Sequence, residues 1–156
     1  VKFNKSMTHM VFVYGTLKRN EPNHHWLTEP NNGTGTFVGE AKTVKKYPLI
    51  IGTRYNIPFL LYEPGVGHFV KGEVYEVDDK MLGNLDVLEE HPNYYMREEH
   101  DKELKCWMYF IKNFKKNLLQ NTYLEDYRSE GSHGLRYLER SKRDPNIKPS
   151  HEILEK

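Results

Sequence analysis

The chain has 156 residues, which is enough for one domain with a hydrophobic core. Its 23 Lys and Arg against 22 Asp and Glu give a formal net charge of +1, so no charge imbalance favours a nucleic acid or a membrane surface as a partner. The single cysteine, Cys106, excludes an internal disulfide and cannot by itself form a zinc site.

The apolar runs are too short to span a membrane, and no secretory segment precedes Met10, so we expect a cytoplasmic protein. Residues 1–9 are interpreted as an N-terminal extension and residues 10–138 as one domain. Residues 139–156 are charged and lack apolar periodicity, which predicts a mobile C-terminal tail.

The first predicted element lies in residues 10–17, MVFVYGTL. Met10–Val13 and Tyr14 form an apolar run rich in β-branched and aromatic residues, which predicts a buried strand. The run breaks at Gly15, and the backbone N–H groups after such a break must find a partner. An anionic group of a small molecule would fit there, although an ordinary turn from strand to loop is the alternative.

The polar residues 18–30 fit a short helix or loop, and the β-rich residues 34–46 follow it. The spacing of Gly33, Gly35 and Gly39 differs from the dinucleotide-binding fingerprint. The sequence also has no Walker-type phosphate loop, so we expect no nucleotide cofactor.

Further apolar and alternating runs predict short strands at residues 49–51, 57–62, 69–77, 94–99 and 104–111. The strongest helical pattern covers residues 78–90, with Asp78 or Asp79 as N-cap and Pro92 as the stop signal. This combination predicts an α+β fold, either a small mixed β-barrel or a strongly bent sheet, with one main helix packed against it.

The predicted helix carries a carboxylate on its apolar face. At about 100° per residue, Met81, Leu82, Leu85 and Leu88 share one face, and Glu89 falls inside that face at about 80° from Met81. Burial would raise the pKa of Glu89, and its place near the negative end of the helix dipole acts in the same direction. Glu89 is therefore the candidate general acid/base.

A structural role for Glu89 is the alternative. It could lie at the rim and face solvent, or pair with a basic residue such as Arg97. Its neighbour Glu90 falls on the polar side, and Asp86 flanks the apolar face as a solvated or capping group.

The region around residues 126–137 offers a second, weaker candidate. Asp126, Ser129 or Ser132, and His133 are the residue types of a hydrolytic triad, but triads are usually assembled from separated elements. The block 129–137 could be a lid over a pocket or a compact surface loop.

Possible metal ligands are clustered near the predicted strand 94–99: His91, Glu98, Glu99 and His100. No second ligand pair has a suitable spacing. A polar strand face is the better interpretation, and we expect no metal.

Three segments, taken in order, resemble the γ-glutamyl cyclotransferase-like family. They are Tyr14–Leu17, the helical residues 85–89 with Pro92, Tyr95 and Arg97 after them, and the block 129–137. The longer stretch 14–23, YGTLKRNEPN, and the block SEGSHGLRY are similar to the γ-glutamylamine cyclotransferase branch in particular. The resemblance extends from about residue 11 to residue 137.

The resemblance implies a small mixed β/α barrel with a pocket beside the first strand and Glu89 as the acid/base. It also implies that the substrate-binding loop consists of Tyr14, Gly15, Thr16 and Leu17. Relatives often carry a small residue after the catalytic glutamate, whereas Glu90 stands here.

The branch acts on γ-glutamyl amines, notably the γ-glutamyl-ε-lysine isopeptide left by digestion of transglutaminase cross-links, and releases 5-oxoproline and the free amine. We therefore expect a monomeric, cofactor-independent cyclotransferase whose partner is a small γ-glutamyl substrate. The substrate's own α-amine would attack, and Glu89 would move the protons. Three alternatives remain: γ-glutamyl amino acids or glutathione as substrates, a non-catalytic binding module, and a hydrolase that uses His133 and releases glutamate.

Overall fold

The structure is a computed structural model that describes residues 7–100 and 105–155. The strands are β1 (Thr8–Val13), β2 (Gly35–Tyr47), β3 (Leu49–Gly52), β4 (Ile57–Leu60), β5 (His68–Asp78), β6 (Met96–His100) and β7 (Cys106–Phe110). The α-helices are α1 (His25–Thr28), α2 (Asp79–Leu88) and α3 (Pro149–Ile153), and the 3-10 helices are η1 (Pro30–Asn32), η2 (Lys116–Gln120) and η3 (Arg140–Lys142). The predicted strands and main helix are all present, within a few residues of their expected ends.

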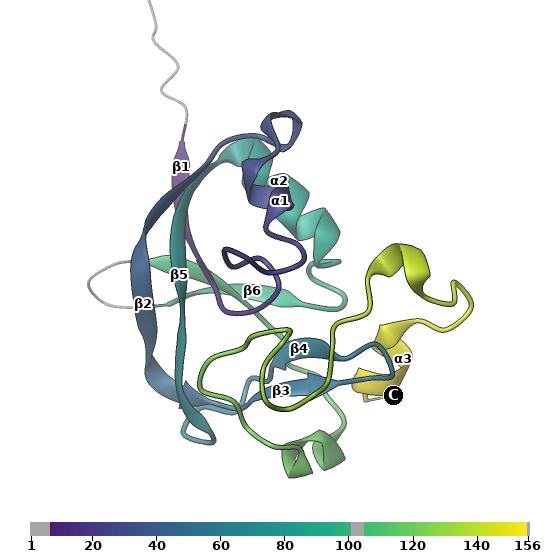
Figure 1. The fold of residues 1–156 in the computed structure, drawn as a ribbon. Coiled ribbons are helices and arrows are strands. Elements are labelled where there is room, and N and C mark those ends of the chain that lie inside the picture. Colours follow the sequence, from purple (N-terminus) through teal and green to yellow (C-terminus); the bar gives the residue numbers. More distant parts are fainter. Residues whose placement is uncertain (1–6, 101–104, 156) are drawn as a thin grey trace, which may run out of the picture.

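Five strands form one sheet in the order β2-β5-β1-β7-β6 (Figure 1). All neighbours are antiparallel except β1 and β7, which run parallel. Because β2 and β6 are opposite edges of this sheet, the predicted closed barrel is not confirmed; the fold is α+β with an open sheet. The register of β2 against β5 shifts twice, which bends the sheet without closing it.

A second sheet consists of the hairpin β3–β4, which single bridges attach to other parts of the chain. Leu61 pairs with Ile111 directly after β7, and Leu49 pairs with Leu124. The hairpin therefore lies across one end of the large sheet, as Figure 1 shows.

The central strand β1 supplies side chains to both sides of the sheet. Val11 and Val13 belong to the core cluster that contains the apolar face of α2, whereas Phe12 and Tyr14 belong to a second cluster with residues of β3, β4 and β7. This alternation follows from the two-residue period of a strand. The predicted buried strand is confirmed, although it begins at Thr8, within the expected extension.

Helix α2 has the predicted N-cap and the predicted phase. The Asp78 carboxylate accepts a hydrogen bond from the backbone N–H of Met81 at 2.8 Å. The four apolar residues of the predicted face, Met81, Leu82, Leu85 and Leu88, are buried. The helix ends at Leu88, ahead of Pro92, so that Glu89 occupies its C-cap position.

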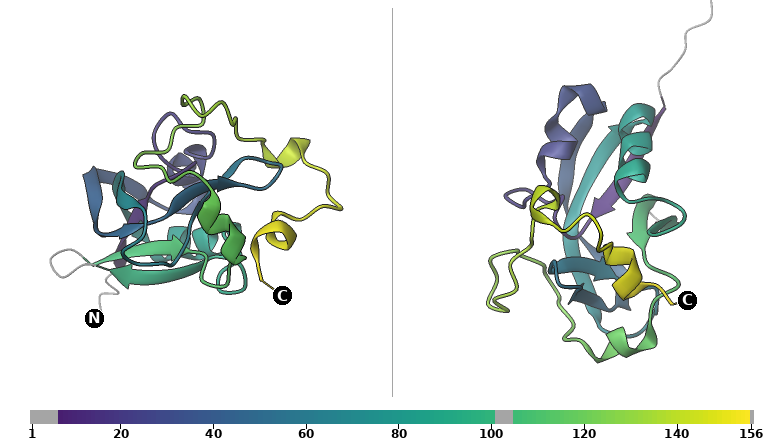
Figure 2. Two further views of the ribbon diagram at one scale, coloured as in Figure 1. Left: turned by 90° about the horizontal axis from the view of Figure 1, so that it is seen from below. Right: turned by 90° about the vertical axis from the view of Figure 1, so that its right-hand side faces the viewer.

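Residues 139–155, here called the C-terminal segment, pack against the body of the molecule. Ile153 is completely buried, and Leu154 bridges to Phe114. The hydroxyl of Tyr55 donates to the carbonyl oxygens of Asp144 and Ile147. Figure 2 (right) shows this segment crossing the molecule between α2 and the β3–β4 hairpin. Mobility of residues 139–156 stays a prediction, and the segment has defined contacts.

The connection between the predicted strands 94–99 and 104–111 falls largely outside the described residues, as does Leu104 at the start of the second of these strands. None of the helices in the described ranges has the length and apolar character needed to cross a membrane.

Candidate active site

A cavity of about 320 Å³ opens beside the end of β1. This volume lies within the range of small-molecule sites, which is about 300–1,000 Å³. Its walls come from the loop after β1, the start of β4, the chain that follows α2, and the C-terminal segment. Residues that line the cavity include Tyr14, Gly15, Thr16, Leu17, Asn23, Pro58, Glu89, Tyr94, Tyr95, Tyr109, Tyr137, Arg140 and Arg143.

The loop 14–17 forms a tight turn at the cavity. Asn23 holds it with a backbone hydrogen bond to the Thr16 carbonyl at 2.8 Å and a side-chain hydrogen bond to the Thr16 hydroxyl at 2.9 Å. Gly15 lies so close to β4 that an added Cβ would be 3.0 Å from the Pro58 ring, which explains the small residue.

Three backbone donors of this loop are free. The N–H groups of Gly15, Thr16 and Leu17 donate to no other residue in the described parts of the chain. Because an unpaired backbone N–H near a cavity requires water or a ligand, the loop offers a cluster of donors to an anionic oxygen.

Glu89 faces the same cavity from the end of α2. Its side chain is partly exposed to the cavity and makes no hydrogen bond or ion pair with any residue that the structure describes. Burial raises the pKa of Glu89 to about 7; the charge of Arg140 acts against this shift, and that of Glu90 adds to it. A carboxyl with this pKa can both take up and release a proton near neutral pH.

The expected alternative partner of Glu89 is bound elsewhere. Arg97 forms an ion pair with Asp86, with Nε 2.7 Å from Oδ1, and that oxygen also accepts a hydrogen bond from the Tyr109 hydroxyl at 2.7 Å. Asp86 is therefore neither a solvated nor a capping group, because these two long-range partners draw it into the structure. Glu89 thus keeps its carboxyl free.

Tyrosines surround Glu89; of these, sequence reasoning placed only Tyr14 in the site. Tyr14 donates to the Tyr109 carbonyl at 2.7 Å, and Tyr95 donates to the Pro58 carbonyl at 3.1 Å. Burial raises the pKa of Tyr14, Tyr94, Tyr95 and Tyr109, and the negative charge of Glu89 adds to the shift at each. These phenols therefore stay neutral. For Tyr94 and Tyr109 the only signal in the sequence was the total of 11 tyrosines.

The residues of the candidate hydrolytic triad and of the possible metal site are not arranged for those functions. His133 accepts a hydrogen bond from the Leu135 N–H at 2.8 Å on Nδ1, so its Nε2 donates to the Arg128 carbonyl at 2.7 Å. Both ring nitrogens of His133 therefore form hydrogen bonds within its own loop. Asp126 accepts a hydrogen bond from Lys18 and none from His133. Within residues 7–100 and 105–155, no three His, Cys, Asp or Glu side chains are grouped so as to hold a metal ion.

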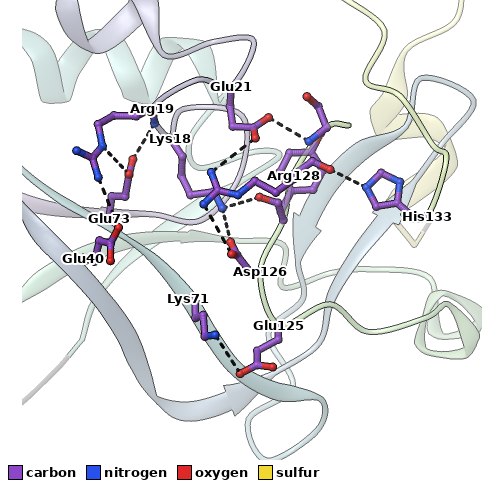
Figure 3. A network of polar contacts seen from close by, with 12 residues as sticks. Lys18, Arg19, Glu21, Glu40, Lys71, Glu73, Glu125, Asp126, Arg128 and His133 are labelled. Atoms are coloured by element: carbon purple, nitrogen blue, oxygen red, sulfur yellow. Dashed lines mark hydrogen bonds and ion pairs between the residues drawn. The ribbon is translucent and has the colours of Figure 1, made fainter. Parts of the chain in front are cut away.

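A polar network supports the loop from behind (Figure 3). Lys18 is almost fully buried, and its Nζ donates to the Asp126 carboxylate at 2.7 Å and to the Tyr127 carbonyl at 2.5 Å. Glu21 accepts from the Ser129 N–H at 3.0 Å. Burial lowers the pKa of Lys18, and Asp126 opposes that shift. The network joins the loop to residues 126–129, at the start of the predicted lid block.

On the other side of the network, Arg19 binds the buried carboxylate of Glu73. Its backbone N–H and its Nε contact the two carboxylate oxygens at 2.8 and 2.9 Å. Burial alone would raise the pKa of Glu73, but these hydrogen bonds hold it below its usual value. Strand β5 therefore anchors the residue directly after Lys18.

A model of the family described as gamma-glutamyl cyclotransferase, AIG2-like, matches residues 11–129. The chain belongs to this family. The resemblance seen in the sequence is thereby confirmed, and the match includes both the loop 14–17 and Glu89.

Individual relatives agree with the family match. A Drosophila melanogaster protein provisionally named a gamma-glutamylcyclotransferase is 54% identical over 127 residues, which cover 78% of this chain and 81% of the relative. The Mus musculus gamma-glutamylaminecyclotransferase is 43% identical over 146 residues, covering 85% of this chain and 98% of the relative. The crystal structure of an AIG2-like protein from Mus musculus superposes with a TM-score of 0.83 at 41% identity, covering 87% of this chain and 99% of that chain.

The network behind the loop predicts the effect of a Lys18→Met substitution. The buried Tyr127 carbonyl and the Asp126 carboxylate lose their donor, so we expect the free energy of unfolding to fall by about 2 kcal/mol. Urea unfolding measures it. The control is Lys71→Met, because Lys71 forms only a half-exposed pair with Glu125 and should contribute less than about 0.5 kcal/mol. Equal losses in both variants would contradict the structural role of Lys18.

The raised pKa of Glu89 predicts that its carboxylate destabilises the fold at high pH. The pKa of this carboxyl is higher in the folded than in the unfolded state. The free energy of unfolding therefore falls as pH rises from the ordinary pKa of a glutamate, about 4.3, to about 7. We expect Glu89→Gln to be more stable than wild type at pH 8, by at most about 4 kcal/mol, and no more stable at pH 4. Thermal unfolding at both pH values measures this. The exposed Glu90→Gln is the control; a gain at pH 8 as large as that of Glu89→Gln would refute the prediction.

Proposed function

We propose that this protein is a γ-glutamylamine cyclotransferase, which converts a γ-glutamyl amine such as γ-glutamyl-ε-lysine into 5-oxoproline and the free amine. The observation that carries the proposal is an unpaired carboxyl with a pKa of about 7 in the same cavity as three free backbone N–H groups. The named relatives, which this chain matches over most of their length, support the reaction class.

The proposed reaction begins with proton removal. The α-ammonium of the substrate is not nucleophilic, and Glu89 in its carboxylate form takes one proton from it. The resulting amine attacks the γ-carbonyl carbon of the same molecule, which forms the five-membered ring. Because both groups belong to one bound substrate, orientation in the cavity provides much of the rate.

The second half of the proposed reaction breaks the amide bond. The carbonyl oxygen becomes negative during the attack, and the N–H groups of Gly15, Thr16 and Leu17 are the donors that would stabilise it or hold the substrate carboxylate. Glu89 gives the proton that it took in the first step to the leaving nitrogen, and the bond between that nitrogen and the carbonyl carbon breaks as the carbonyl re-forms. Glu89 then takes the extra proton of the ring nitrogen and passes it to the released amine, which departs as an ammonium ion while the carboxylate is restored.

The first test is turnover of γ-glutamyl-ε-lysine, with 5-oxoproline and lysine detected by mass. We expect wild type and Glu90→Gln to form both products. Glu89→Gln should lose at least about 100-fold in kcat while still binding 5-oxoproline, because only proton transfer is removed. Release of glutamate would instead indicate a hydrolase. Binding of 5-oxoproline without turnover of γ-glutamyl amines, γ-glutamyl amino acids or glutathione would indicate a binding module.

The pH dependence tests the role of Glu89 independently. Because the base must be ionised, kcat/KM should fall as pH drops below about 7. Removing the nearby positive charge in Arg140→Gln should move this limb to higher pH, and removing the negative charge in Glu90→Gln should move it to lower pH. Shifts in the same direction in both variants would exclude Glu89 as the titrating group.

A further inference from the structure

The C-terminal segment places a second arginine at the cavity, beyond Arg140. The Nε of Arg143 donates to the Leu138 carbonyl at 2.9 Å. Its guanidinium carbon lies 5.1 Å from the ring centre of Tyr55 and equally far from that of Tyr137. Two aromatic rings and one hydrogen bond therefore hold this cation in a fixed position at the cavity wall.

Part of this arginine is buried without a partner. The Nη2 atom of Arg143 and the hydroxyl of Tyr94 are buried, and neither has a hydrogen-bond partner among the residues that the structure describes. Both side chains line the cavity. Burial raises the pKa of Tyr94, and the charge of Arg143 acts against that shift, which indicates that the two groups are electrostatic neighbours. Leaving such donors unpaired costs free energy, which an anionic ligand would recover.

Nearby carboxylates do not neutralise Arg143. It forms no ion pair with a carboxylate in the described ranges. The adjacent Asp144 accepts a hydrogen bond from the Asn146 N–H at 2.9 Å, within its own turn. Arg140, by contrast, lies near Glu89 and donates to the Leu88 carbonyl at 3.3 Å. Arg143 is therefore a cation available to a ligand, and among the cavity-lining cations, which include Lys148, it is the one with a buried, unpartnered nitrogen in the described ranges.

We propose that Arg143 and Tyr94 bind a carboxylate on the leaving amine, so that the enzyme prefers γ-glutamyl amines whose amine carries a carboxylate over simple γ-glutamyl amines. This inference rests on the proposed function. With the γ-glutamyl group held by loop 14–17 and Glu89, the amine portion extends toward the remaining wall, which the C-terminal segment supplies. The family model ends at residue 129, so Tyr94 lies inside the matched stretch and Arg143 lies outside it.

A matched pair of substrates tests the proposal. γ-Glutamyl-ε-lysine and γ-glutamylcadaverine differ only by the carboxylate of the leaving amine. We expect wild type to favour the lysine compound by about tenfold or more in kcat/KM, as a charged hydrogen bond would give. Arg143→Gln should lose most of this preference, because kcat/KM should fall for the lysine compound and stay unchanged for the cadaverine compound. Tyr94→Phe should lose part of the preference. Arg136→Gln, whose arginine pairs with Glu130 on the exposed loop, should keep it.

Each result has a defined meaning. Equal kcat/KM for the two substrates in wild type, or an equal loss on both substrates in Arg143→Gln, would overturn the inference and leave the proposed function intact. Absence of 5-oxoproline from both substrates would overturn the function and the inference together. Thermal unfolding and 5-oxoproline binding check that the variants fold. If Arg143→Gln does not fold, the substrate preference is measured in Tyr94→Phe and Arg143→Lys. An unchanged preference in both variants would refute the proposal.

Discussion

A partly buried carboxyl without a partner among the described residues is the constraint on which the site depends. Glu89 follows the last turn of α2 on the side that packs into the core, and tyrosines line the cavity around it. The structure leaves this carboxyl free because the neighbouring cations are committed elsewhere: Arg97 to Asp86, and Arg140 to the Leu88 carbonyl. A direct ion pair would stabilise the fold and lower the pKa of Glu89, and the carboxyl would then no longer exchange protons at neutral pH.

The rest of the cavity is built from segments that are far apart in the sequence. The loop after β1 is supported from behind by Lys18 and Arg19, which bind residues of two different segments. Its front faces β4, where Gly15 approaches Pro58. The C-terminal segment completes the opposite wall with two arginines of different roles. One adjusts the charge of Glu89, and the other has a free, buried donor for a ligand.

Local patterns predicted the local parts of this structure. The N-cap at Asp78 and the phase of α2 depend only on residues within a few turns, and the structure confirms both. The closed barrel is not confirmed: closure depends on whether the distant edges β2 and β6 pair, which strand patterns do not encode. The partners of Asp86 and the cavity positions of Tyr94 and Arg143 also depend on tertiary contacts. No periodicity in the sequence marks them.

The parallel pair β1–β7 has a consequence for how the protein folds. The hydrogen bond from Tyr14 to the Tyr109 carbonyl joins residues 95 positions apart, and the adjoining strands pair only when this long loop closes. Closing such a loop lowers the conformational entropy of the chain before the new contacts stabilise it, so non-local pairings slow folding. The α2 helix and the β3–β4 hairpin involve short separations and can form earlier. The cavity therefore forms late in folding. During refolding, a mutation that delays β1–β7 pairing would slow the recovery of ligand binding more than the formation of helical structure.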